Sequence, residues 1–516
     1  MKKGLLALSC VALSAFLISC QDGSSLSESQ SSSPEESSAS ASSASTSSTA
    51  DSSSSGTIEG NVIYAAPNLQ VGTSPDGSKE NPYTFENGLK NLKQGGTLYL
   101  LEGTYAYGQA IVISEDTYDL YPATSEEERK TIEPAVKDDG SLAEVLFDFS
   151  SMIYNSSNRG LSFNTDYWHL KNVEVQGAGD NGIYIGGNHN IIEGIDVHHC
   201  SDTGIQLGRA DGTYNSIDLW PSYNTILNCT SHDNADPTGE DSDGFACKLT
   251  TGVGNVFDGC IAYNNVDDGW DLYTKGSSGE IGPVTLKNCI AFNNGITSYG
   301  VGTANSDGNG FKLGGESISV AHQVYNCLAF NNLATGFTDN SNPGTIRIEN
   351  CTSFNNGTRD TDANNFDMAR NVATSSNYYK NLLSYCSGYR TSPIDGTTAI
   401  SNSKDEYCGT ASYSIFYYGL AMWRFEGIQN CKYTDSSLKG TMFTESQNRS
   451  PFVSTTTLQP QASSGVEASE HVDVHSLFRA EDGSIALGDI FKVNPESDFY
   501  TMGENGTPLG CDLSGE

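Results

Sequence analysis

The chain has 516 residues, of which 36% are hydrophobic and 54 are glycine, and its formal net charge at pH 7 is −36. This composition is typical of a solenoid with many turns. The strong negative charge argues against nucleic acid as a partner, because phosphate backbones bind to positively charged surfaces.

The chain opens with the pattern of an export signal. Met1-Lys2-Lys3 precedes an apolar run to Ile18, and Leu17-Ile18-Ser19-Cys20 resembles a lipobox. The pattern predicts that residues 1–19 are a lipoprotein signal peptide and that the thiol of Cys20 carries a lipid after cleavage. We therefore expect an exported bacterial lipoprotein, attached to a bacterial membrane by its N-terminal lipid and located at the outer membrane or cell surface.

The region from Cys20 to residue 56 is dominated by Ser, Ala, Thr, Asp and Glu. It cannot bury enough apolar surface to become ordered, so residues 20–56 are expected to be the lipidated cysteine and a disordered tether. Residues 57–110 are expected to form an N-terminal cap and the first coils. The helical spacing of apolar residues from Phe85 to Leu92 predicts a helix that covers the open end of the solenoid.

Residues 111–385 contain a repeat of short apolar segments that end in cysteine. Asparagine or glycine precedes each of these cysteines, and asparagine follows each one five residues later. The cysteines are Cys229, Cys260, Cys289, Cys327 and Cys351, and the following asparagines are Asn234, Asn265, Asn294, Asn332 and Asn356. The repeat predicts an all-β fold, a parallel β-helix with one coil per repeat that forms the catalytic core.

The same repeat predicts how its cysteines and asparagines are used. The cysteines are expected to stack inward as free thiols, although an exported protein would also permit disulfides between neighbours such as Cys260 and Cys289. The asparagine amides are expected to hydrogen-bond from coil to coil. These residues are therefore interpreted as structural.

The side chains that could carry out chemistry are concentrated between Asp243 and Lys312. When three repeats are aligned on their Gly-aromatic pairs, Asp243, Asp268 and Asn309 share one column, and Ala246, Asp271 and Lys312 share another. Equivalent positions on neighbouring coils of parallel strands lie about 4.8 Å apart. Four carboxylates, from Asp243, Asp267, Asp268 and Asp271, are therefore expected to converge, with Lys312 at their edge.

Four acids that converge repel one another unless a cation joins them. Calcium suits this donor set best, because it accepts several carboxylates in a loose geometry. The absence of nearby paired His or Cys ligands disfavours zinc. The alternative interpretation is a solvated acidic turn edge without a metal.

A metal held by acids beside a lysine suits removal of a proton next to a carboxylate. The metal would bind the substrate carboxylate, and a neutral Lys312 would act as general base. Lysine ordinarily titrates near about 10.4, so Lys312 needs a lowered pKa or an alkaline medium. Elimination of the 4-linked sugar would then cut a uronic acid polymer without water.

Further residues are expected on the same face. Lys248 should share a column with Tyr273, so both are candidates for substrate binding, although a solvated strand lysine is an equal alternative. Arg209 is a third candidate, because it opens an inserted loop at residues 209–223. Insertions at residues 235–242 and 295–308 are also expected to wall a cleft.

Beyond Cys386 the repeat fades. Residues 386–516 are expected to form C-terminal coils and a covering segment that packs along the solenoid without chemistry of its own. We expect the protein to be a monomer.

The chain resembles the pectate lyases of polysaccharide lyase family nine. The resemblance is carried by Asp243-Gly244-Phe245, Asp267-Asp268-Gly269-Trp270-Asp271, Asn309-Gly310-Phe311-Lys312-Leu313-Gly314-Gly315, the Asn-Cys coils, the stretch from Ala66-Pro67-Asn68 to Gly103-Thr104-Tyr105, and Phe491-Lys492-Val493. It implies a right-handed parallel β-helix and β-elimination of polygalacturonate. It also matches Asp243, Asp267, Asp268 and Asp271 to the calcium ligands and Lys312 to the lysine base. The insertion at residues 295–308 is a departure that leaves the shape of the cleft, and hence endo or exo action, open.

Alternative functions remain at this stage. They are a lyase for another uronic acid polysaccharide, a galacturonan hydrolase, and a non-catalytic, calcium-stabilised carbohydrate-binding solenoid. Asn164-Thr165-Asp166 resembles a hydrolase acid motif, but it lies several coils before Asp267 and Asp268, and no Gly-His-Gly follows it. An adhesin would not need Lys312, and a hydrolase would give no unsaturated product.

Overall fold

The computed structural model describes residues 61–68, 74–118, 120–357, 363–369, 377–385, 405–416, 422–429, 431–433, 451–454 and 478–515. The predicted signal peptide, the lipidation site Cys20 and the predicted tether lie outside these residues. Thr57–Glu516 forms one compact unit. Among the described residues, no helix has both the length and the apolar character needed to cross a bilayer.

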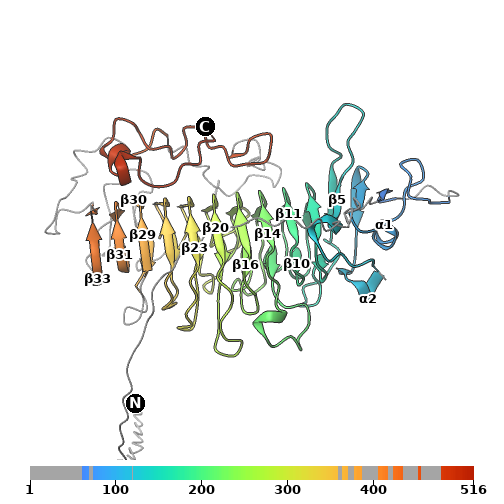
Figure 1. Ribbon diagram of the computed structural model, residues 1–516, viewed down its shortest axis with the longest axis horizontal. Helices are drawn as coiled ribbons and strands as arrows, with labels where there is room; N and C mark the ends of the chain where they lie inside the picture. The colour runs from blue at the N-terminus through green and yellow to red at the C-terminus, as the bar shows by residue number, and fades with distance from the viewer. Residues whose placement is uncertain are drawn as a thin grey trace, which may run out of the picture. The chain divides into compact units, whose positions relative to one another are not determined.

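The strands pair in three parallel ladders, which wind into a β-helix (Figure 1). The first ladder comprises β1 (Val62–Ala65), β2 (Thr97–Leu100), β5 (Lys130–Pro134), β8 (Trp168–Lys171), β11 (Ile191–Glu193), β14 (Thr225–Leu227), β17 (Val256–Asp258), β20 (Thr285–Lys287), β23 (Gln323–Tyr325), β26 (Arg347–Glu349), β29 (Asn377–Lys380), β31 (Glu406–Ser412) and β33 (Met422–Gln429). The second, here named the site ladder, comprises β4 (Ile111–Ile113), β7 (Leu161–Phe163), β10 (Ile183–Ile185), β13 (Ile205–Leu207), β16 (Phe245–Cys247), β19 (Trp270–Asp271), β22 (Phe311–Lys312), β25 (Phe337–Thr338) and β28 (Phe366–Met368), and it also meets β31.

The third ladder comprises β3 (Gly103–Ala106), β6 (Val145–Asp148), β9 (Glu174–Gln176), β12 (Asp196–His198), β15 (Thr230–His232), β18 (Ile261–Tyr263), β21 (Ile290–Phe292), β24 (Leu328–Phe330), β27 (Thr352–Phe354), β30 (Leu383–Tyr385), β32 (Ile415–Phe416) and β34 (Lys432–Tyr433). The predicted parallel β-helix is therefore confirmed. Pairing continues to Tyr433, although the sequence repeat fades at Cys386, because strand pairing needs only the backbone.

Aromatic side chains stack inside the site ladder. Trp270 lies between Phe245 and Phe311, with ring centroids 4.8 Å apart on each side, and all three side chains are fully buried. The spacing equals the distance between parallel strands, so each coil repeats the packing of the previous one. Neighbouring residues in a strand point to opposite faces. Because Trp270 and Phe311 point into the core, Asp271 and Lys312 lie on the outer face.

The residue before each repeated cysteine turns the chain. Asn228, Asn288, Asn326 and Asn350 have φ between 52° and 54°, and Gly259 has φ 66°. This left-handed conformation is accessible to glycine and asparagine but strained for most other residues. The cysteines after these turns are fully buried and free, as predicted.

The predicted asparagine ladder is also present. The side-chain amide of Asn234 donates to Asn265, and the chain of bonds continues through Asn294 and Asn332 to Asn356, with distances of 2.8–3.1 Å. All five side chains are fully buried. Each of these five side chains therefore has a hydrogen-bond partner on a neighbouring coil.

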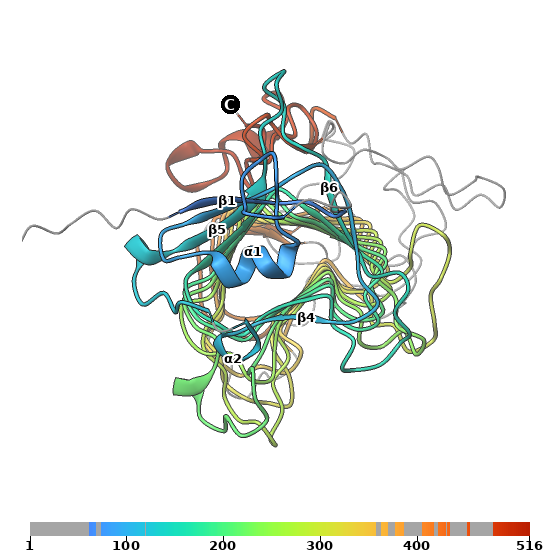
Figure 2. The same cartoon turned by 90° about the vertical axis from the view of Figure 1, so that its right-hand side faces the viewer.

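Helix α1 (Phe85–Asn91) lies across the N-terminal opening of the coils (Figure 2). The hydroxyl of Thr84 caps it by accepting a hydrogen bond from the amide of Asn87. Phe85 and Leu89 are buried and pack into the end of the core. The predicted helical cap is confirmed. The other helices within the described residues are α2 (Glu115–Tyr118), η1 (Glu126–Glu128), η2 (Ile217–Leu219), η4 (Asp498–Thr501) and η5 (Glu504–Gly506).

The C-terminal residues 478–515 run along the coils (Figure 1) and cover the third ladder. Phe478 packs edge-on against Phe292 at 5.8 Å, and Phe491 packs against Phe330 at 4.7 Å. The guanidinium of half-buried Arg479 donates to the carbonyls of Cys229 and Gly259 at 2.9 and 2.8 Å. The predicted covering segment therefore buries an outward aromatic column and is held to the middle coils.

Candidate active site

Strand register brings the predicted acids together. β16, β19 and β22 are neighbours in the site ladder, and Ala246, Asp271 and Lys312 are in register across them. The turns before β16 and β19 carry Asp243, Asp267 and Asp268, each of which offers a carboxylate oxygen within 4.8 Å of the others. The three side chains are buried. The column alignment thus corresponds to spatial neighbours.

Backbone and side-chain donors fix two of these carboxylates. Oδ1 of Asp268 accepts from the amide nitrogen and the side chain of Asn309 at 2.7 and 2.9 Å. Asp243 accepts from the hydroxyl of Thr203 at 3.1 Å and from the amide of Asp268 at 3.3 Å. The carboxylates are therefore held in place before any ligand arrives.

Lys312 reaches the same cluster. Its Nζ lies 3.2 Å from Oδ2 of Asp268 and 2.9 Å from Oδ2 of Asp307, and its side chain is 12% exposed. Burial alone would lower the pKa of Lys312, but Asp268, Asp271 and Asp307 outweigh burial and hold the pKa well above its ordinary value. These carboxylates therefore favour the protonated amine, whereas a general base at this position would need a lowered pKa.

Lys248 does not stand free for a substrate carboxylate. Its Nζ lies 2.7 Å from Oδ2 of Asp243 and 3.1 Å from Oδ2 of Asp271. The pKa of Lys248, which burial would lower, is held well above its ordinary value by these two acids. It is neither a solvated lysine nor an open substrate contact, because the turn before β16 brings Asp243 within reach of its side chain.

Asp271 differs from the other three predicted ligands. It lies beside them but outside the group of three whose oxygens converge. Burial would raise the pKa of Asp271, but the ammonium groups of Lys312 and Lys248 outweigh it and lower the pKa. In this arrangement Asp271 stabilises the positive charges of Lys312 and Lys248.

Two inserted loops stand beside the cluster. The hydroxyl of Thr303, in the insertion at residues 295–308, donates to the carbonyl of Thr238, in the insertion at residues 235–242. The same loop carries Asp307, whose amide donates to Asp267 and whose carboxylate accepts from Lys312. The two loops therefore contact each other and wall one side of the site.

The nearby lysines do not fully compensate the negative charge of Asp243, Asp267 and Asp268. Burial raises the pKa of Asp243 and of Asp267 well above the ordinary value, and the neighbouring carboxylates raise both further. Burial likewise raises the pKa of Asp268 to about 6, even with Lys312 beside it. Oδ2 of Asp268 is buried and accepts no hydrogen bond, although it lies in the ion pair with Lys312. An all-carboxylate donor set with this deficit fits a hard cation such as Ca²⁺.

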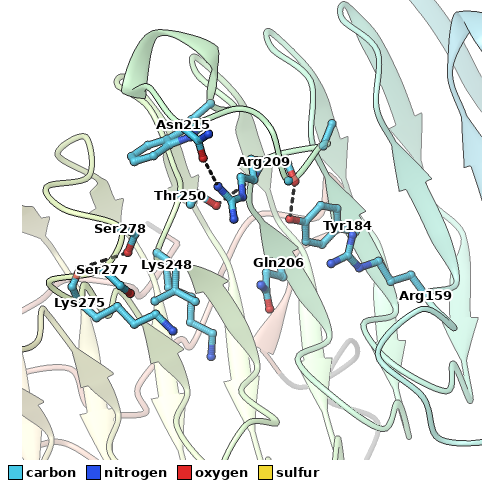
Figure 3. A pocket seen from close by; sticks show the side chains of 14 residues that line it. Arg159, Tyr184, Gln206, Arg209, Asn215, Lys248, Thr250, Lys275, Ser277 and Ser278 are labelled. Carbon is cyan, nitrogen blue, oxygen red and sulfur yellow. Dashed lines mark hydrogen bonds between the residues drawn. The ribbon is translucent and has the colours of Figure 1, made fainter.

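The other predicted substrate contacts lie nearby. Tyr273 donates its hydroxyl to Glu316 at 2.9 Å, and its ring lies 5.8 Å from Nζ of Lys312. Arg209 lines a cleft of about 840 Å³ that also includes Lys248 (Figure 3). Its guanidinium donates to Asn215 at 3.0 Å and to the carbonyl of Tyr214 at 3.3 Å. Tyr273 is thus close to Lys312, and Arg209 belongs to the cleft beside the acids.

Sequence reasoning missed several residues of this region. Asp307 lies in an insertion, where the repeat gives no column, and its only signal was an acid five residues before Lys312. Arg159 and Lys275 line the cleft with Arg209, but they stand in turns outside the repeated Gly-aromatic segments. Asn309 was placed in the acid column without a role, and it donates to Asp268.

Comparison with known proteins gives a consistent result. A family model described as "Pel9A-like, right handed beta helix region" matches residues 63–381. The chain is 40% identical over 457 residues to "Pectate lyase L" of Paenibacillus polymyxa (strain SC2), which covers 88% of this chain and 86% of the relative. It is 31% identical over 366 residues to "Pectate lyase L" of Dickeya dadantii (strain 3937), covering 68% and 76% respectively.

A solved structure of pectate lyase Pel9A has the same fold. The two chains share a TM-score of 0.58 at 24% identity, over 87% of this chain and 95% of the other. The predicted right-handed parallel β-helix and the resemblance to pectate lyases are thereby confirmed. The chain belongs to the Pel9A-like right-handed β-helix family.

Proposed function

We propose that the protein is a calcium-dependent pectate lyase that cleaves polygalacturonate by β-elimination, with Lys312 as general base. One observation carries the proposal: Nζ of Lys312 lies 3.2 Å from Asp268, within a buried group of three convergent carboxylates. Similarity to proteins named pectate lyase over most of the chain supports the same assignment.

Asp243, Asp267 and Asp268 would hold the calcium ion, with Asp271 next to them. When bound, the ion would neutralise these carboxylates and withdraw electrons from the substrate carboxylate, which acidifies the adjacent proton. The donor set supports this role, because the carboxylates are buried and the pKa values of Asp243 and Asp267 are raised by burial and by neighbouring acids despite the nearby lysines.

In the reaction, Nζ of Lys312 accepts the proton from C5 of a galacturonate residue. The C5–H electrons form a C4=C5 double bond, the bond between C4 and the glycosidic oxygen breaks, and water supplies the proton to the departing oxygen. Asp307 and Asp268 hold the amine at the edge of the acids. Lys312 must be uncharged to accept a proton, and Asp268, the acid that raises the pKa of Lys312 most, is one of the acids that calcium would neutralise.

The test is an assay of the full mature chain with polygalacturonate and calcium. The expected result is a rising ultraviolet absorbance from the new C4=C5 bond, which disappears on chelation of calcium and in Lys312→Ala. Lys287→Ala, which removes a half-exposed lysine of β20 in the first ladder, serves as the charge control. A saturated product, or full activity in Lys312→Ala, would show that the mechanism is wrong.

We also propose that the chain is exported and carries a lipid on Cys20, as the lipobox-like sequence indicates. Mass spectrometry of the mature N-terminus would test this. The expected mass contains the acylated cysteine, and Cys20→Ala is expected to release the protein from the membrane fraction. A mature chain that begins elsewhere or lacks acyl groups would contradict the proposal.

A further inference from the structure

The cleft beside the acids is lined by positive side chains. Arg159, Arg209, Lys248 and Lys275 face its volume of about 840 Å³, with Arg159 at one end, the two lysines at the other and Arg209 between them (Figure 3). The chain as a whole has a net charge of −36. On a protein with this negative net charge, the four cations create a local region of positive electrostatic potential.

These residues come from successive coils. Arg159 precedes β7, Arg209 follows β13, Lys248 follows β16, and Lys275 follows β19. The strands from β7 to β19 are neighbours through β10, β13 and β16. Four steps of about 4.8 Å give a length of roughly 19 Å, which is longer than one sugar residue. The cleft therefore suits a polymer that lies along the coils.

Arg159 is held at its end of the cleft. Its guanidinium stacks 3.4 Å from the ring centroid of Tyr184, and its Nε lies 3.3 Å from Oδ2 of Asp180. Tyr184 is itself buried and donates its hydroxyl to the carbonyl of Arg209 at 3.0 Å. One tyrosine thus links the two arginines, and their orientation is set before a ligand binds.

Arg209 and Lys275 form no ion pair within the described residues, although Asp211 and Glu316 lie near enough to interact with them electrostatically. Arg209 donates only to neutral oxygens, those of Asn215 and Tyr214. In the described part of the chain, the ion pairs include Lys248 and Arg159 but not Arg209 or Lys275. These two groups retain their charge for an anionic ligand.

We propose that this cleft binds the carboxylates of further uronate residues, on the side of the metal site that faces the N-terminal coils. Arg159, Arg209 and Lys275 are the residues that recognise these carboxylates. The inference rests on the proposed function and extends it, because it assigns recognition of the neighbouring uronate carboxylates to named side chains outside the metal site. A neutral polysaccharide would gain nothing from this surface.

Binding is measured on the Lys312→Ala protein, which cannot cleave its ligand under the proposed mechanism. Calorimetry with calcium present compares saturated galacturonate chains of three and six residues and the fully methyl-esterified six-residue chain. Arg159→Gln, Arg209→Gln and Lys275→Gln are each expected to weaken binding of the charged six-residue chain by about threefold to tenfold. The three-residue chain, bound at the metal site, should change less.

Three comparisons make the result specific. Arg209→Lys keeps the charge and should keep most of the affinity, whereas Lys287→Gln removes a charge from another ladder and should have no effect. Affinity for the six-residue chain should fall as salt rises, and less steeply in the Gln variants. Circular dichroism verifies that each variant is folded.

Unchanged affinity of the three folded Gln variants for the charged chain, or equal affinity of the parent for charged and esterified chains, would overturn the inference. Either result leaves the proposed function standing if the unaltered enzyme still forms the unsaturated product. Failure to form that product would instead refute the proposed function.

Discussion

The Nζ of Lys248 lies 2.7 Å from Oδ2 of Asp243, one of the three convergent carboxylates. The side chain of Lys248 is 11% exposed and that of Asp243 is fully buried, so the pair has little access to water. Lys248 thus supplies part of the positive charge that these acids need. It occupies one oxygen of a carboxylate that would also bind a metal ion.

We predict that Lys248→Gln makes the fold more dependent on calcium. In chelator, the free energy of unfolding should fall by on the order of 3 kcal/mol, because Asp243 stays buried without its cation. In calcium, most of this loss should be recovered, and the calcium affinity should be higher than in the unaltered protein. Urea unfolding with and without calcium measures both effects. Lys287→Gln is the control, and an equal loss in both conditions would contradict the prediction.

The asparagine ladder should be sensitive at its centre. Asn294 donates to Asn332 at 2.9 Å and accepts from the side chain of Asn265 at 3.1 Å. Asn294→Leu removes both side-chain bonds in a dry interior and leaves the buried backbone N–H of Asn265 without its acceptor, so the free energy of unfolding should fall by about 3 kcal/mol. Asn91→Ala, on the exposed end of α1, should change it by less than about 0.5 kcal/mol. Thermal unfolding of both variants provides the comparison.

Arg479 is predicted to hold the covering segment in place. Its guanidinium donates to the carbonyls of Gly259 and Cys229 and to the hydroxyl of Thr230, so Arg479→Met leaves buried acceptors without a donor. We expect faster proteolysis of residues 478–515 and binding of a hydrophobic dye, while pectate cleavage at the site ladder continues. Arg347→Met removes a half-exposed arginine that pairs with Glu349, and it should leave the digestion pattern unchanged.

The imidazole of His232 should make stability depend on pH. Burial would lower its pKa, but Asp196 and Asp233 outweigh burial and raise the pKa from 6.5 to about 10. The folded state binds the proton more tightly than the unfolded state, so this stabilisation is complete below about pH 6.5 and is lost as the pH rises through 10. His232→Gln should therefore destabilise the protein by on the order of 3 kcal/mol at pH 6.

The difference between His232→Gln and the unaltered protein should shrink as the pH approaches 10. Urea unfolding at several pH values measures it. His169→Gln removes an imidazole that pairs with Glu193 closer to solvent, and it should have a smaller effect at pH 6. A difference for His232→Gln that does not change with pH would contradict the assignment of the charge to His232.

The fold and the column positions could be predicted from the sequence. In a parallel β-helix, equivalent residues of successive repeats become spatial neighbours. Trp270 and Phe311 could be predicted to stack, and Asp271 to lie beside Lys312, from spacing alone. The four asparagines and the one glycine before the cysteines are residue types that accept the left-handed conformation found there. These are properties of the backbone and of one-residue alternation, which a repeat encodes directly.

Other parts of the site could not be predicted in this way. The ion pair of Lys248 with Asp243 depends on the reach of a long side chain across two strand ends, and the contact of Asp307 with Lys312 depends on the path of an insertion. Neither contact recurs with the sequence repeat, so the repeat does not predict it. The raised pKa of Lys312 likewise follows from the summed charge of its neighbours, which the alignment of columns does not reveal.

The position of residues 478–515 has a consequence for the order in which the protein is made. The outward column of Tyr263, Phe292 and Phe330 emerges early in synthesis, but Phe478 and Phe491, which shield Phe292 and Phe330, come last. Until translation finishes, the nascent chain exposes this column of aromatic side chains, which favours self-association. Premature stop codons near the 3′ end should thus produce insoluble protein even though every catalytic group has already been translated.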